Sequence, residues 1–247
     1  MTTQDRKVPG HFPYWAMIMI IAFYAVLPPL YYALKQQFQQ AASFTLFDYY
    51  VMSFIMLFIT TGGYQLYFWC QKAYIGEAIE IRETRLDSFI PKIPSAIYVY
   101  NLLYYIGFGL CIVSIVSYKH FAHVLAVGLG LLCFHALFFT FIPTKLPATS
   151  REKQNENEQK ENAFIELTQS IDDVYNAFPS AHVSLSILIF YLTRATFGPI
   201  TILFPMLITA SCLLTKQHFV IDCAGGVVYA IIYIALVNAF YPFKVFR

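Results

Sequence analysis

The chain has 247 residues, of which 58% are hydrophobic and 12% are charged, about half the charged share of a soluble domain. This composition excludes a soluble globular protein and predicts an integral membrane protein, in which the 24 Phe and 19 Tyr residues suit two aromatic-rich membrane interfaces. The net charge of +2 and the scattered basic residues argue against a nucleic-acid partner.

Long hydrophobic runs predict membrane-spanning helices, because one span needs about 20 mostly apolar residues. Polar residues and glycines over 60–65 interrupt the second run, and Pro28-Pro29 should bend or end the first. We expect an all-α, polytopic transmembrane helical bundle with six to seven spans, seven being favoured, in one integral-membrane domain over 1–247. The runs lie near 13–34, 48–70, 95–117, 121–142, 179–197, 199–215 and 219–241.

Two polar segments separate these runs. Residues 76–94 mix acidic and basic side chains, which predicts an interfacial segment before the third span. Residues 150–173 hold seven of the fourteen acidic residues, a composition that cannot bury a core. The second segment is therefore predicted to be a polar loop between spans. We therefore expect a multi-pass integral membrane protein, located in the cell inner membrane if the source is bacterial.

Two short motifs stand at the edges of apolar runs, where polar side chains are costly unless they are used. Pro179 suits a first helical position, which puts His182 in the first turn of the fifth span. His218 and Asp222, four residues apart at the start of the seventh span, share one helix face. With seven spans both motifs lie on one side, which predicts an active site at one membrane face. The motifs are Phe178-Pro179-Ser180-Ala181-His182 and Lys216-Gln217-His218-Phe219-Val220-Ile221-Asp222.

This set of residues suits chemistry on a phosphate ester, which needs a nucleophile, a proton donor and groups that neutralise the phosphate oxygens. His218 is the candidate nucleophile, forming a phosphohistidine, and Asp222 can accept its second N–H and fix the tautomer. His182 is the candidate general acid for the leaving alcohol. A single interfacial histidine is more often a packing residue, but the combination of these residues is more specific than its parts.

The candidate phosphate anchors are less distinctive. Ser180 and the free N–H groups at its helix start can hold phosphate oxygens. Lys216 can supply positive charge if it lies in the loop before the seventh span, and otherwise resembles an interfacial lysine. In the loop after the fourth span, Lys145 is the better further anchor and Arg151 the weaker one.

The two motifs together resemble those of the type-2 phosphatidic acid phosphatase superfamily, whose second motif reads Pro-Ser-x-His and whose third ends His-x-x-x-Asp. The wording of residues 215–219, 87–94 and 141–145 is similar to the branch that contains inositol phosphorylceramide synthases, with sphingomyelin synthases further off. The likeness covers roughly residues 85–230.

The resemblance implies that His218 is the nucleophile, Asp222 its orienting partner and His182 the acid. It also implies that Ser180, Lys145 and Lys216 bind phosphate, with no metal or other cofactor. The substrates of such proteins are lipid phosphates, lipid pyrophosphates or phospholipid head groups.

This sequence departs from the superfamily pattern at three places. In relatives an Arg-Pro pair comes shortly after the second proline of the first motif. Here Ala148 follows that proline, Pro147, and the nearest arginine, Arg151, lies further along the chain. Cys212 follows Ser211 in place of another arginine, for which Lys216 is the substitute. Ala181 replaces a common glycine in the second motif.

The function that we expect is a membrane-embedded lipid phosphatase acting on a lipid phosphomonoester or pyrophosphate, with the substrate and membrane lipids as partners. The alternative is a phosphotransferase that moves a phospholipid head group to a lipid alcohol. Two other hypotheses are a metal enzyme that uses His182, His218 and Asp222 as ligands, which no HExxH pair or cysteine cluster supports, and a non-enzymatic membrane protein.

Overall fold

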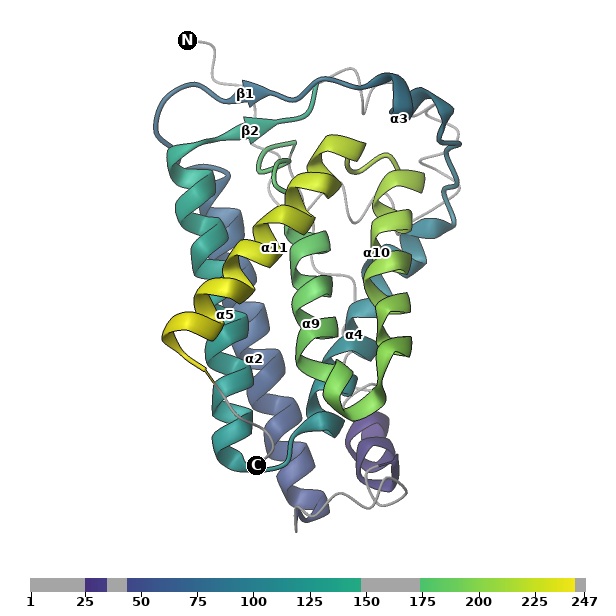
Figure 1. Cartoon of the computed structure of the whole chain (residues 1–247), viewed down its shortest axis with the longest axis vertical. Coiled ribbons are helices and arrows are strands. Elements are labelled where there is room, and N and C mark those ends of the chain that lie inside the picture. Colours follow the sequence, from purple (N-terminus) through teal and green to yellow (C-terminus); the bar gives the residue numbers. More distant parts are fainter. Residues whose placement is uncertain (1–24, 35–43, 148–173, 243–247) are drawn as a thin grey trace.

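The computed structural model describes residues 25–34, 44–147 and 174–242 (Figure 1). The N-terminal half of the first predicted span, the predicted polar loop at 150–173 and Arg151 lie outside these residues.

The described part of the chain is mostly helical, and the predicted apolar runs coincide with its helices. Four helices are long and apolar enough to cross a membrane, which confirms the prediction of a helical membrane bundle. They are α2 (Leu46–Cys70), α4 (Ala96–Ser114), α5 (Tyr118–Phe141) and α11 (Val220–Phe240). Shorter apolar helices are Ala25–Leu34, α9 (Ala181–Phe197) and α10 (Leu203–Leu214), which follows the 3-10 helix η1 (Pro199–Ile202).

Two predicted interruptions do not break their helices. Helix α2 continues through residues 60–65, and Thr60 donates its hydroxyl hydrogen to the carbonyl oxygen of Met56 at 2.7 Å. That bond satisfies the polar group inside the helix, so it needs no other partner. The first helix includes Pro28 and Pro29 within Ala25–Leu34, so these prolines do not end it.

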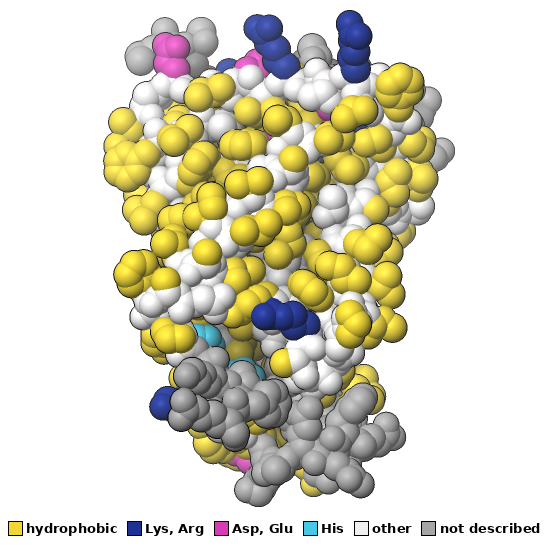
Figure 2. Space-filling view, viewed as in Figure 1, with side chains coloured by type: hydrophobic (Ala, Val, Ile, Leu, Met, Phe, Trp, Pro, Cys, Tyr) yellow, Lys and Arg dark blue, Asp and Glu magenta, His cyan; other side chains and the backbone are white. Residues whose placement is uncertain are grey.

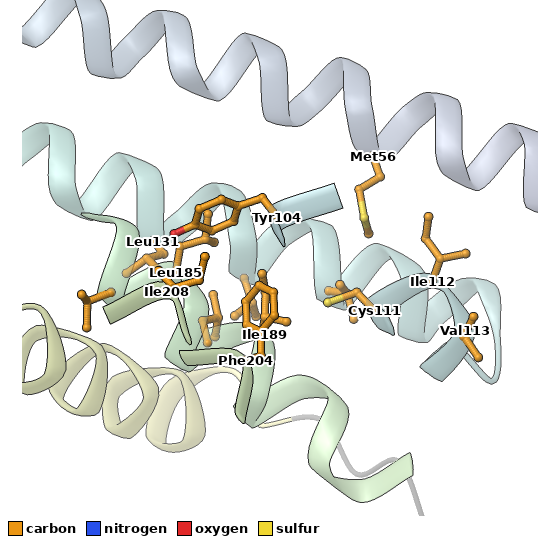
Figure 3. Packing of buried hydrophobic residues seen from close by; sticks show 14 of the residues in the cluster. Met56, Tyr104, Cys111, Ile112, Val113, Leu131, Leu185, Ile189, Phe204 and Ile208 are labelled. Carbon is orange, nitrogen blue, oxygen red and sulfur yellow. The ribbon is translucent and has the colours of Figure 1, made fainter. Parts of the chain in front are cut away.

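Helix α9 is the central element of the bundle, because it packs against α4, α5, α10 and α11. Figure 3 shows part of the buried hydrophobic cluster between these helices, in which Leu185 and Ile189 of α9 lie among Tyr104, Phe204 and Ile208. Hydrophobic side chains cover most of the face in Figure 2, as expected for a surface in contact with lipid.

One end of the bundle carries a small cap. Strands β1 (Ile79–Glu80) and β2 (Thr144–Lys145) pair in parallel, and the short helix α3 (Arg85–Phe89) follows β1. Figure 1 shows this cap at the end where α9 and α11 begin. The predicted interfacial segment 76–94 forms much of it. The strands are too short to leave an alternating pattern in the sequence.

Candidate active site

The first motif forms the start of α9, with Ser180 as the N-cap. Its hydroxyl oxygen accepts a hydrogen bond from the Val183 N–H at 3.4 Å, and its own N–H donates to the carbonyl oxygen of Asp222 at 3.0 Å. The helix begins at Ala181, so the prediction that Pro179 takes the first helical position is wrong. Ser180 is a much better N-cap than Phe178, which would cap a helix that began at Pro179, because the serine oxygen satisfies a first-turn N–H. The Ser180 side chain is fully buried.

The second motif forms the turn that enters α11. His218 precedes the helix, which begins at Val220, so it does not lie on the helix as predicted. The turn still brings its Nδ1 to 3.7 Å from Oδ2 of Asp222, longer than a hydrogen bond. Asp222 is fully buried. Its Oδ2 accepts the Phe219 N–H at 2.8 Å, whereas its buried Oδ1 has no hydrogen-bond partner among the described residues.

The two motifs meet at the capped end of the bundle. The imidazole rings of His182 and His218 lie 5.8 Å apart between centroids. A phosphoryl group needs about 3 Å to an attacking nitrogen and about 3 Å from its leaving oxygen to a proton donor. Two rings at this centroid separation are close enough for both to contact one phosphoryl group. His218 is buried and His182 only partly so.

Two glycines of α11 allow this close approach. A Cβ atom on Gly225 would lie 2.2 Å from the ring of Phe178, and one on Gly226 would lie 2.6 Å from the carbonyl oxygen of Ser180. Both distances are far below van der Waals contact. Neither glycine was assigned a role from the sequence.

Lys216 makes contacts other than those expected of a phosphate anchor. Its ammonium group donates to the carbonyl oxygens of Asp87 and Ile90, each at 2.7 Å. The Asp87 carboxylate in turn accepts the Val220 N–H at 2.7 Å and the Thr84 N–H at 2.8 Å. Lys216 and Asp87 therefore tie the α3 segment to the turn that carries His218.

Sequence reasoning did not identify this role of Asp87. One signal for it was present, namely an acidic residue three positions after Thr84, which is a helix-capping pattern.

The loop after α5 joins the site through Thr144. The Thr144 hydroxyl donates to the carbonyl oxygen of Phe178 at 3.0 Å and accepts the N–H of the same residue at 2.9 Å. The next residue, Lys145, is partly buried and pairs through its backbone with Tyr175. Among the described residues, no hydrogen bond or ion pair engages its ammonium group. Of the two predicted lysine anchors, Lys145 is thus the one with an available charge.

Two tyrosines of α4 flank His182, and the sequence analysis assigned them no role. The Tyr100 hydroxyl lies 3.2 Å from Nδ1 of His182, and the two rings stack with centroids 4.3 Å apart. The Tyr104 hydroxyl donates to the carbonyl oxygen of His182 at 2.7 Å.

The sequence profile of the PAP2 superfamily matches residues 91–236, more than half of the chain. The chain belongs to the PAP2 superfamily. The matched region contains both motifs, all of α9 and most of α11. Searches of curated proteins and of solved structures found no match. Membership indicates a phosphatase-type activity on phosphate esters, of a kind that is generally independent of metal, in a multi-pass integral membrane protein.

In this PAP2 protein the described structure gathers five of the seven predicted site residues around the starts of α9 and α11. Four of them are held there by contacts within and between the two motifs, namely His182, His218, Asp222 and Ser180. Lys216 lies beside them but bonds the α3 segment.

The other two predicted site residues are placed less directly. Lys145 is linked to the site through the neighbouring Thr144. Arg151 lies outside the described residues.

Proposed function

We propose that this protein is a membrane-embedded lipid phosphatase that hydrolyses a lipid phosphomonoester or pyrophosphate through a phosphohistidine on His218. The observation that carries the proposal is the pair of imidazoles 5.8 Å apart, with the buried Asp222 carboxylate behind one of them. The hydrophobic side chains on the face in Figure 2 support a substrate that is itself held in the membrane.

In the first step, Nε2 of His218 attacks phosphorus while the bond from phosphorus to the ester oxygen breaks. The Nδ1–H of the histidine faces Oδ2 of Asp222 at 3.7 Å. This contact shortens as the ring gains positive charge, because hydrogen bonds to charged partners are shorter and stronger. The leaving oxygen takes a proton from His182, so the lipid departs as a neutral alcohol.

In the second step, His182 takes a proton from a water molecule, whose oxygen then attacks phosphorus. The bond from phosphorus to Nε2 of His218 breaks, and inorganic phosphate is released. Three groups are available to stabilise the phosphate oxygens. The N–H groups of Ala181 and His182 lie in the first turn of α9 and have no acceptor within the helix, and Lys145 supplies positive charge.

We also propose that all seven helical segments cross the membrane and that the site opens at one membrane face. Helix α9 has 17 residues and is about 25 Å long, close to the thickness of the hydrocarbon core. Seven crossings would place the starts of α9 and α11 and the β1–β2 cap on the same side, in agreement with their common position in Figure 1.

The alternative is a phosphotransferase in which a lipid alcohol, rather than water, attacks the phosphohistidine. Residues 87–94 and 215–219 resemble the inositol phosphorylceramide synthase-like branch. The contact between Lys216 and Asp87 joins these two segments into one structural unit beside His218. The same three catalytic residues serve either reaction.

The test is phosphate release from phosphatidic acid by detergent-purified protein in EDTA, with and without added ceramide as an acceptor alcohol. His218→Gln should abolish release. His123→Gln should not, because His123 lies near the start of α5, away from the helix end that is next to the site, and stacks on Tyr241. An acid-labile phosphoenzyme should form in wild type only. Full release by a folded His218→Gln protein would overturn the mechanism. Formation of a new phospholipid from the acceptor, with no release of inorganic phosphate, would favour the transferase.

A further inference from the structure

We infer that Tyr100 is a positioning residue that holds Nδ1 of His182, so that Nε2 is the nitrogen that protonates the leaving oxygen. The inference rests on the proposed function, in which His182 is the general acid. It is carried by the 3.2 Å distance from the Tyr100 hydroxyl to Nδ1 and by the stacking of the two rings, 4.3 Å apart and 29° from parallel.

The geometry restrains both parts of His182 at once. Tyr100 and Tyr104 lie four residues apart and therefore on one face of α4. The first contacts the imidazole, and the second donates to the backbone carbonyl oxygen of the same residue at 2.7 Å. Both tyrosines are buried, and a buried hydroxyl normally requires a hydrogen-bond partner. The ring of His182 is therefore fixed in rotation as well as in position.

The contact matters chemically because a phenol hydroxyl both accepts and donates hydrogen bonds. In the acid form of His182, both ring nitrogens carry hydrogen, and Nδ1–H donates to the Tyr100 oxygen. When Nε2 gives its proton to the leaving oxygen, Nδ1 keeps its hydrogen and the bond to Tyr100 persists. Proton transfer therefore requires no rotation of the ring, and the same atom can recover its proton from water in the second step.

The two histidines of the site are thus supported in the same way by different groups. His218 has its Nδ1 beside the Asp222 carboxylate, and His182 has its Nδ1 beside a neutral phenol. Nδ1 of His182 is occupied by Tyr100, and its Nε2 makes no hydrogen bond to the described residues. In His182 the partner on Nδ1 therefore leaves Nε2 as the nitrogen that meets the leaving oxygen.

The experiment compares two phosphomonoesters that differ in how much they need an acid. A short-chain phosphatidic acid has a poor alkoxide leaving group, whereas p-nitrophenyl phosphate releases a stable phenolate. Tyr100→Phe keeps the stacked ring and removes the hydroxyl. We expect kcat/KM for the alkyl ester, which reports only the steps up to the phosphoenzyme, to fall about tenfold, the factor for one hydrogen bond lost in the transition state. The kcat/KM for the aryl ester should change less than about twofold.

The ratio of the two kcat/KM values does not depend on how much of the protein is folded, so the test holds even if the variant is unstable. Tyr98→Phe, the same change at an exposed position of α4, is the matched control and should leave the ratio unchanged. Tyr104→Phe should lower both kcat/KM values by a similar factor, because it acts on the backbone. An equal fall for both substrates in Tyr100→Phe would show a merely structural role and overturn the inference.

His182→Gln separates this inference from the proposed function on which it rests. If it affects the alkyl ester much more than the aryl ester, the acid role stands and the Tyr100 result judges the inference alone. If it lowers kcat/KM for both esters equally, His182 is not the acid, and the proposed mechanism fails whatever Tyr100→Phe shows.

Discussion

Gly226→Ala is the substitution that tests most directly whether the close packing of α9 on α11 builds the site. The added methyl group would lie 2.6 Å from the Ser180 carbonyl oxygen and 3.0 Å from Cβ of Val183. The first of these is a backbone atom at the start of a helix, so no side-chain rotation relieves the contact. The start of α9 must instead move away from α11.

The size of that movement sets the expected effect. Restoring normal contact requires a shift of roughly 0.5 Å or more, and overpacking of this kind costs about 1–3 kcal/mol. Alanine's better helix propensity offsets up to about 1 kcal/mol. Because Ser180 precedes His182 by two residues, the shift also moves one imidazole relative to the other. A misplacement of about 1 Å can cost a hundredfold in rate, so we expect turnover to fall about tenfold.

The assay combines thermal unfolding in detergent with phosphate release by the folded protein. Gly62→Ala is the matched control, because Gly62 is exposed on α2 and a Cβ there meets nothing within 4 Å. It isolates the gain in helix propensity and should leave turnover unchanged. Wild-type melting and wild-type turnover in Gly226→Ala would refute the reasoning, since they would show that the two helix starts are not in contact.

Two further substitutions test the surroundings of the site. Thr144→Val removes the hydroxyl that pairs with both backbone groups of Phe178 and leaves each without that partner, at about 1–3 kcal/mol apiece. Thermal unfolding should show a clear loss that Thr144→Ser does not, and equal melting of the two variants would contradict this role. Lys216→Met removes two hydrogen bonds to the α3 segment, so it should lower the melting temperature. It should also lower kcat by a larger factor than it raises KM. A raised KM with unchanged kcat and melting would instead indicate that Lys216 binds phosphate.

Much of the architecture could be predicted from the sequence, because a membrane imposes a simple rule. A chain segment that crosses lipid must be apolar for about 20 residues and must satisfy its own backbone hydrogen bonds. The predicted runs therefore coincide with helices, including the interrupted second run, which α2 spans without a break. The predicted polar motifs lie together at one end of the bundle, since consecutive helices alternate in direction and every second helix therefore starts on the same side.

The sequence also determined which residues are candidates for chemistry. His182, His218 and Asp222 stood out because polar groups next to apolar runs are costly unless they serve a purpose. Their spacing did not determine how they are held. His218 lies in a turn rather than on a helix, and only the fold of that turn places it beside Asp222.

The tertiary structure alone decided the partners of these residues. The Lys216 ammonium bonds two carbonyl oxygens of a segment more than a hundred residues earlier in the chain. Tyr100 meets His182 across 82 positions. Such contacts leave no local pattern, because they depend on the angle and distance at which helices pack. Helix length and polarity follow from the local sequence, whereas the direction in which a side chain's polar atoms point depends on which other helices lie beside it.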